Sequence, residues 1–408
     1  MVTHTKPSLG HVGAATAAQR PDVIAGLIAL SLVGVVLLEP RLGPNGAFVD
    51  AALVLLVVLG VRAIAVGDAP PALTTWRATR LWLLLIALGT ALSLYSSGIT
   101  GWASIDIAQS VYSVAIFFGC YALIWQRRRL LPIFAIAIAA GILVTTVSLV
   151  LTLQPGVRPS GAFYHPNYAG HYLVVAAAVC WWASPWRPLK IAAVAVAGLG
   201  VYLTASFGAL IMAGTLVAYI LLRAARQRPW VLAFTGAAAL TLVAVVTPAT
   251  ITAGLGQFTV SDTLTSTRFE RSEGGRLGVW EESLSTVPDH PLGVGPDGLH
   301  NRQMITVARE PHNLYVAFLA ERGAIGLVGL IGLGIALWRQ LPAGGLSRPL
   351  IVTLAVGNMF RETFHYRHMW LLLAVAVVVD LSRQERTERP VKPDQEASGS
   401  TTPLRGAR

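Results

Sequence analysis

His312 and Asn313 open a segment that otherwise has the composition of a membrane helix, in the stretch PHNLYVAFLAERGAIG. A neutral imidazole can take a proton near neutral pH, so His312 is a candidate general base. Asn313, the next residue, would orient that base or a bound substrate. Pro311 suits the first position of a helix, which predicts that both polar residues lie in the first turn. Four carboxylates are alternative bases: Glu281, Asp289, Asp297 and Glu310.

The same segment carries two glycines and an acid deeper in the helix. At about 100° per residue, Gly323 lies roughly 20° and Gly326 roughly 40° around the axis from His312, provided that the helix is unbroken. Small residues on that face let a neighbouring helix approach closely. Glu321 lies on the opposite side and is expected to be an interior ion-pair partner more than a catalyst.

Arg158 and Asn167 belong to a second polar stretch, RPSGAFYHPNYAG. Its prolines and glycines predict a loop on the outer side of the membrane that leads into a helix. Asn167 follows a proline and precedes an apolar run, which is the position of a helix cap. Arg158 is a candidate ligand for an anion. The alternative is a plain loop with a helix cap.

Arg276 lies in a third stretch, GGRLGVWEESLSTVPDHPLGVG. Leu277, Trp280 and Leu284 have helical spacing, and the glycines of PLGVG would let backbone N–H groups approach a ligand. A guanidinium is a planar fork that matches phosphate, so Arg276 is a further candidate anion ligand. The alternative is a folded cap with charged residues on its surface.

A fourth stretch, FRETFHYRHMW, carries Arg361 and Arg367 between two apolar segments. Positive charge on the outer side of a membrane departs from the usual distribution of basic residues. Both arginines are therefore candidate ligands for an anionic substrate. A structural network with Glu362 is an equal alternative.

The rest of the chain must hold these residues at one face of a membrane. Of its 408 residues 54% are hydrophobic and only 12% charged, and the apolar residues occur in blocks. About 20 apolar residues cross a bilayer core as a helix, so the blocks predict an all-helical, polytopic membrane protein. The expected helices span residues 22–39, 47–66, 79–97, 103–125, 130–153, 168–184, 188–204, 206–223, 230–248, 312–338, 347–361 and 367–382.

Basic residues alternate from one inter-helix segment to the next. If the N-terminus is cytoplasmic, the cytoplasmic segments hold most of the 31 Lys and Arg residues. This pattern predicts that both termini are cytoplasmic. The net charge of +11 then reflects topology and contact with anionic membrane lipids, and no nucleic acid partner is needed to explain it. Cys120 and Cys180 lie inside apolar blocks, without the spacing of a disulfide or a metal site.

These blocks divide the chain into five regions. A cytoplasmic tail is expected at 1–21, nine helices at 22–248, a large extracytoplasmic loop of short helices at 249–311, three helices at 312–382 and a disordered cytoplasmic tail at 383–408. No pair of matching halves is evident, which argues against the internal repeats that are common in transporters.

Taken together, His-Asn-x9-Gly-x-x-Gly, RPSGAFYHPN and the Arg-Trp-PLGVG loop resemble the superfamily of O-antigen ligases and O-antigen polymerases. The resemblance covers nearly the whole chain and implies a membrane-embedded fold of the glycosyltransferase C type. It implies an enzyme of the bacterial inner membrane that moves a glycan from undecaprenyl diphosphate to an acceptor hydroxyl. The acceptor would be a lipid A-core or another glycan, and no metal ion or other cofactor is implied.

The resemblance also assigns residues. The essential histidine of the family corresponds to His312, and its diphosphate-binding arginines correspond best to Arg276 and less closely to Arg158. Many members carry an arginine where this chain has Phe207. Either Arg158, Arg361 or Arg367 takes its place, or this chain binds the donor in a different way. The ligase interpretation is preferred, a polymerase shares the same chemistry, and a flippase for the same lipid-linked glycan is the alternative from another class.

Overall fold

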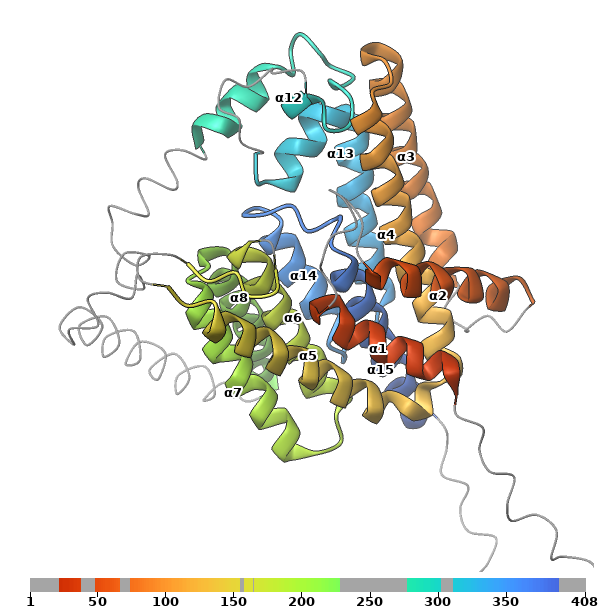
Figure 1. Cartoon of the computed structure of the whole chain (residues 1–408). Helices are drawn as coiled ribbons and strands as arrows, with labels where there is room; N and C mark the ends of the chain where they lie inside the picture. Colours follow the sequence, from red (N-terminus) through yellow and green to blue (C-terminus); the bar gives the residue numbers. More distant parts are fainter. Residues whose placement is uncertain are drawn as a thin grey trace, which may run out of the picture.

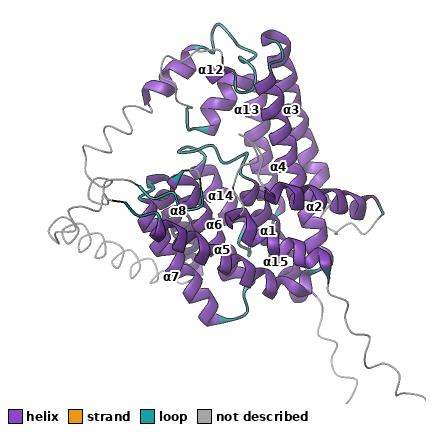
Figure 2. Ribbon diagram, viewed as in Figure 1, coloured by secondary structure: helices purple, strands orange, loops and turns teal. Residues whose placement is uncertain are grey.

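The computed structural model describes residues 22–37, 48–66, 74–154, 158–163, 165–227, 277–301 and 311–388. Within these ranges every regular element is a helix (Figure 2). The helices are α1 (Val23–Leu37), α2 (Phe48–Ala65), α3 (Thr74–Ser97), α4 (Gly101–Gln126), η2 (Arg128–Leu130), α5 (Leu131–Leu151), α6 (Pro166–Ala183), α7 (Arg187–Thr204), α8 (Phe207–Gln227), α12 (Gly298–Asn301), α13 (Leu314–Gln340), α14 (Ser347–Gly357) and α15 (Arg367–Glu388). Residues 277–285 are also helical.

Each predicted segment except 230–248 contains a helix, and that range lies outside the described residues. Among the described helices, 6 are long and apolar enough to cross a membrane. They confirm an all-helical polytopic membrane protein but do not reproduce twelve full spans. The predicted helix 347–361 ends at Gly357, and the 11 residues of α14 cover only about 16 Å, roughly half of a bilayer core. The predicted helix 367–382 continues to Glu388 through a charged run.

The helices form two groups that α15 connects. Figure 1 shows α3, α4 and α13 together in one group of roughly parallel helices, in which α3 and α13 pack closely against each other. The second group contains α5, α6, α7 and α8, with α14 packed against α8. Since α15 contacts both α4 and α6, it joins the two groups. Its apolar stretch LLLAVAVVVDL begins at Leu371, and ten of these eleven residues are buried.

One end of the bundle is fixed by a buried carboxylate. Asp380, near the end of α15, accepts hydrogen bonds from the Trp182 indole at 2.8 Å and from the Ser347 backbone N–H at 2.7 Å. Its carboxylate therefore caps the start of α14 and ties it to the end of α6. At the same end, Arg223 of α8 donates to the Gly345 carbonyl at 3.4 Å.

The opposite end gathers the start of α13, the end of α14 and the start of α15. The Leu314 N–H of α13 donates to the Asn358 carbonyl at 2.9 Å. The Asn358 side-chain oxygen in turn accepts from the backbone N–H and the hydroxyl of Thr363, at 2.9 and 2.7 Å. One asparagine thus fixes the loop of residues 358–366 to the start of α13.

The long helix α13 is broken at Gly323, where φ is 66° and ψ is −179°. Such a backbone is essentially restricted to glycine. The expectation of an unbroken helix that carries His312, Gly323 and Gly326 on one face is therefore wrong. The glycines do serve close packing: a Cβ atom at Gly89 of α3 would lie 2.5 Å from the Gly326 nitrogen, so the two backbones touch.

Residues 277–301 form a small cap of helix and turns on this break. Val279, Val294, Leu299 and Ala320 of α13 make its core. The N–H groups of Val294 and Gly295 donate to the Ala320 and Glu321 carbonyls, at 2.9 and 3.0 Å. The prediction that PLGVG offers these N–H groups to a ligand is therefore wrong, because they hold the cap on α13 instead.

Candidate functional site

His312 lies just outside α13, in a turn that fixes its side chain. Its φ of 50° is in the left-handed region, which few residues other than glycine adopt. Asn313 is the helix cap, and its side-chain oxygen accepts from the N–H groups of Tyr315 and Val316 at 3.0 and 3.2 Å. The helix therefore starts after Asn313, and not at Pro311 as the sequence suggested. Backbone strain of this kind tends to occur at functional sites.

The first-turn N–H groups of α13 already have partners. Leu314 donates to Asn358, Tyr315 and Val316 donate to Asn313, and Ala317 donates to the Asn313 carbonyl at 3.0 Å. An anion at this helix start would find these donors occupied. The charge that binds an anion must therefore come from side chains.

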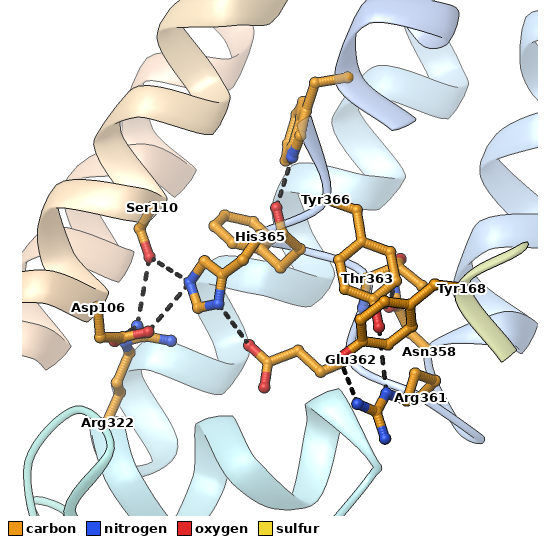
Figure 3. Close-up of polar contacts among 12 residues, drawn as sticks. Asp106, Ser110, Tyr168, Arg322, Asn358, Arg361, Glu362, Thr363, His365 and Tyr366 are labelled. Atoms are coloured by element: carbon orange, nitrogen blue, oxygen red, sulfur yellow. Dashed lines mark hydrogen bonds and ion pairs between the residues drawn. The ribbon is translucent and has the colours of Figure 1, made fainter. Parts of the chain in front are cut away.

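Arg361 supplies such a charge directly beside His312. Its Nη1 atom lies 2.8 Å from Nδ1 and 3.3 Å from Nε2 of the imidazole. Nη2 donates to the Tyr168 hydroxyl, and Nε donates to the Tyr366 hydroxyl at 3.1 Å (Figure 3). The guanidinium also lies over the Tyr168 ring, 4.6 Å from its centroid. Arg361 is only 7% exposed, so its charge acts in a site with little water.

A second charged cluster lies next to this pair and joins three elements. His365 Nε2 lies 3.0 Å from Asp106 Oδ1 of α4, and His365 Nδ1 lies 3.3 Å from Glu362 Oε1 (Figure 3). Asp106 also forms an ion pair with Arg322 of α13, which is 3% exposed. The Ser110 hydroxyl lies 3.0 Å from His365 Nε2. Burial alone would lower the pKa of His365, but the Glu362 and Asp106 carboxylates outweigh it and raise this pKa above its ordinary value.

This cluster lies beside Glu321, whose own role as an ion-pair partner stays a prediction. Its neighbour Arg322 provides the interior ion pair, with Asp106 on α4 as its partner. Because residues 106 and 322 are far apart in the chain, nothing in their local sequence indicates the contact.

Arg158 and Asn167 contact each other at the start of α6. Arg158 Nη2 lies 2.9 Å from the Asn167 side-chain oxygen and 2.8 Å from the Thr204 carbonyl at the end of α7. The predicted cap is wrong in one detail: His165 caps α6, and its Nδ1 accepts from the Asn167 N–H at 3.1 Å. Arg158 thus joins the start of α6 to the carboxyl end of α7.

Arg367 forms an ion pair with a residue of another helix. Its Nη1 donates to Asp50 Oδ2 of α2 at 2.9 Å, and the Tyr112 hydroxyl donates to the other oxygen of the same carboxylate at 3.1 Å. This ion pair links the starts of α2 and α15. Arg276, the remaining arginine predicted to bind substrate, lies outside the described residues.

Phe207 contacts the segment that carries Arg361. Its ring packs edge-on against Phe360, with centroids 5.8 Å apart. The residue that follows Phe360 is Arg361. Position 207, at which the sequence lacks an expected arginine, therefore contacts the residue directly before Arg361, which comes from a different loop.

The cap reaches the site through Trp280. Its indole N–H donates to the Pro311 carbonyl at 2.7 Å, directly before His312. Sequence reasoning assigned Trp280 only to a helix face. It also missed Tyr168 and Tyr366. Tyrosines are common at the ends of membrane helices, so the sequence alone does not show which of them bind an arginine side chain.

An apolar groove of about 520 Å³ begins beside the site and runs between α13, α14 and α15. Asn358 and Thr363, which hold the loop of Arg361, line its polar end. Leu330, Trp338 and Leu373 line its apolar length. In the described part of the chain, no group of His, Cys, Asp or Glu has an arrangement that would hold a metal ion.

Comparison with protein families gives one match. Residues 191–331, from α7 to the middle of α13, match the family model described as O-antigen ligase. The matched region contains His312, Asn313 and the cap, and ends before Arg361. It supports the resemblance to the O-antigen ligase and polymerase superfamily. No curated protein matches the chain.

Proposed function

We propose that this chain, which carries the O-antigen ligase match at residues 191–331, is a membrane glycosyltransferase of the O-antigen ligase and polymerase superfamily. It moves a glycan from undecaprenyl diphosphate to an acceptor hydroxyl at the outer face of the inner membrane, and both termini are cytoplasmic. The ligase is the preferred form, with a lipid A-core or another glycan as the acceptor. The fold is of the glycosyltransferase C type with about twelve spans.

The observation that carries this proposal is the contact between His312 and Arg361. Glycan transfer from a lipid diphosphate needs a base for the acceptor hydroxyl and positive charge for the leaving group. The diphosphate is a stable anion, so charge stabilisation matters more for its departure than protonation does. A histidine and a buried arginine 2.8 Å apart supply both functions at one place.

In the reaction, His312 takes the proton of the acceptor hydroxyl as its oxygen attacks the anomeric carbon. The bond from that carbon to the phosphate oxygen breaks, and undecaprenyl diphosphate leaves with the bonding electrons. A single in-line displacement inverts the anomeric centre. Arg361 stabilises the charge that develops on the departing diphosphate, as a preorganised donor in a site with little water.

Arg361 also controls the state of His312. A guanidinium only donates, so the imidazole nitrogen that it contacts must be an acceptor, and the permanent charge favours the neutral imidazole. While Arg361 occupies Nδ1, that nitrogen cannot take a proton. A donor diphosphate that draws Arg361 toward itself frees the base, so that the base becomes available only when the donor is bound.

Arg361 is the best replacement for the arginine missing at position 207. Phe207 packs on Phe360, whereas Arg158 is held by the Thr204 carbonyl and Arg367 by Asp50. Arg276 and Arg158 remain further candidate ligands for the diphosphate. The groove beside Asn358 and Thr363 takes the first isoprene units of the carrier, whose diphosphate then lies near Arg361.

Reconstitution into liposomes tests the proposal. The purified protein receives an undecaprenyl diphosphate-linked repeat unit and a lipid acceptor, and the products are separated by gel and identified by mass spectrometry. Glycan on the new acceptor, with release of undecaprenyl diphosphate, is the expected result. Longer glycans that remain on undecaprenyl diphosphate would identify a polymerase. A protein that binds the donor but transfers nothing to either acceptor would contradict the proposal and favour a flippase.

A further inference from the structure

A small basic pocket lies at the end of the bundle opposite His312. It has a volume of about 240 Å³ and is lined by Arg128, Arg129, Ser382, Glu385 and Arg386. Ser382 is fifteen residues beyond the start of α15 at Arg367, which is about 22 Å along the helix axis. The pocket is therefore separate from the proposed transfer site, and no step of the proposed reaction uses it.

Three guanidinium groups face a single carboxylate in this pocket. Arg128 Nη2 lies 3.5 Å from Glu385 Oε2, and both side chains are about one-third exposed, so solvent weakens this pair. Arg129 and Arg386 are exposed, and no ion pair joins either of them to another described residue. The pocket therefore keeps an excess of positive charge, which attracts an anion.

Arg128 is held in place for such a ligand. Its guanidinium lies over the Trp125 ring, 4.6 Å from the centroid, and its Nη1 donates to the Trp125 carbonyl at 3.4 Å. An arginine that is stacked on an aromatic ring loses less rotamer freedom when it binds a ligand.

Ser382 provides a buried hydroxyl in the same pocket. The residue is 6% exposed, and its hydroxyl oxygen has no hydrogen-bond partner among the described residues. A buried polar group without a partner costs about 1–3 kcal/mol. A phosphate oxygen in the pocket would accept this hydrogen bond, whereas a halide would make poorer use of the same donor.

The surroundings of the pocket indicate which phosphate is available. Four tryptophans at this end of the bundle lie under cationic side chains: Trp125 under Arg128, Trp181 under Lys190, Trp182 under Arg383 and Trp338 under Arg348. Tryptophan and basic residues together mark the headgroup region of a bilayer. Arg128 both lines the pocket and covers Trp125, so the pocket belongs to this region of tryptophan and basic residues.

From these observations we infer that the pocket formed by Arg128, Arg129, Ser382 and Arg386 binds the phosphate of an anionic phospholipid headgroup. Arg128 and Arg386 neutralise the phosphate, and Ser382 donates to one of its oxygens. Free phosphate shares this chemistry, but a lipid phosphate is already held in the headgroup region by its acyl chains. The inference does not depend on glycan transfer, so either proposal can fail alone.

Native mass spectrometry of the purified full-length protein tests the inference. The protein is released from nanodiscs of phosphatidylcholine that contain a minor fraction of phosphatidylglycerol, and the retained lipids are counted. The wild-type protein should retain phosphatidylglycerol selectively. Each arginine near an anionic surface contributes about 1 kcal/mol, so R128Q and R386Q should each lower the relative retention about five-fold, and the double variant about 25-fold. Ser382→Ala should lower it less.

Arg339→Gln is the matched control, because Arg339 is an exposed arginine at the same end that does not line the pocket. It should retain phosphatidylglycerol as the wild type does. Equal retention by the wild type, R128Q and R386Q would overturn the inference. So would displacement of the lipid by millimolar inorganic phosphate together with a phosphate adduct on the protein, because the pocket would then bind free phosphate. Thermal unfolding of each variant separates loss of lipid from loss of fold.

Discussion

Replacing Arg361 tests how one residue can serve both the leaving group and the base. Arg361 contacts His312, Tyr168 and Tyr366 through three different nitrogens. Arg361→Lys keeps the charge but loses the fork, so it can keep only part of these contacts. Arg361→Gln removes the charge as well. Loss of one preorganised donor to a developing anion lowers turnover by a factor of about 10²–10³. We therefore expect turnover to fall by a factor of about 10² in Arg361→Lys and about 10³ in Arg361→Gln.

The same substitution should move the pH dependence. Two charges about 4 Å apart interact by roughly 4 kcal/mol at the dielectric of a protein surface. Solvent screens part of this interaction energy. Even one third of it would shift the pKa of His312 by about one unit, since one pKa unit corresponds to about 1.4 kcal/mol. Without Arg361, protonation of His312 becomes easier. The acidic limb of the pH–rate profile should therefore move to higher pH by about one unit or more in Arg361→Gln.

The assay measures release of undecaprenyl diphosphate in liposomes between pH 5 and 9, with Arg339→Gln as a control for the loss of one positive charge elsewhere. Donor binding and the melting temperature are measured on the same preparations, so that a fold defect is recognised. Turnover of Arg361→Gln within about threefold of the wild type, or an acidic limb that does not move, would refute the assignment of Arg361.

Three further changes test the elements that position the site. Trp280→Phe loses the hydrogen bond to the Pro311 carbonyl and should lower turnover about five-fold with little change in melting temperature, which steady-state kinetics checks. Gly323→Ala should lower the free energy of unfolding by about 1–3 kcal/mol because of the positive φ. Gly334→Ala is the control and should be nearly neutral, because its added Cβ meets nothing within 4 Å. Thermal unfolding compares the two variants, and equal melting temperatures would contradict the role of the break. The raised pKa of His365 means that its charged form stabilises the fold fully below about pH 6.5, and this contribution fades as pH rises through the folded pKa. His365→Gln should therefore destabilise the protein more at pH 6 than at pH 9, and a pH-independent loss would argue against charged His365.

The sequence predicted the helices well because apolar blocks depend on local composition alone. It also identified His312 and Arg361 as candidates, from two stretches that lie 49 residues apart. It did not indicate that they touch, because this contact depends on the Asn358 hydrogen bonds that fix the loop of residues 358–366 to the start of α13.

The errors have a common physical origin. Helix periodicity assumed that α13 is regular, but the chain needs a break at Gly323 so that the cap can approach the Ala320 and Glu321 carbonyls. The cap assigned to Asn167 belongs to His165 two residues earlier, since a histidine nitrogen can accept the same backbone hydrogen bond as an asparagine oxygen. In both places the tertiary contact decides between local alternatives that the sequence leaves nearly equal.

The most direct test of the central claim is a single-turnover transfer assay with His312→Ala and with Glu362→Gln and Asp297→Asn as carboxylate comparisons. Donor-loaded liposomes receive the acceptor, and the new glycosidic product is quantified over time. We predict that His312→Ala binds the donor but loses transfer by about 10²–10⁴, whereas both carboxylate variants keep measurable transfer. Near-normal transfer by His312→Ala, together with its loss in either carboxylate variant, would contradict the account and assign the base to that carboxylate.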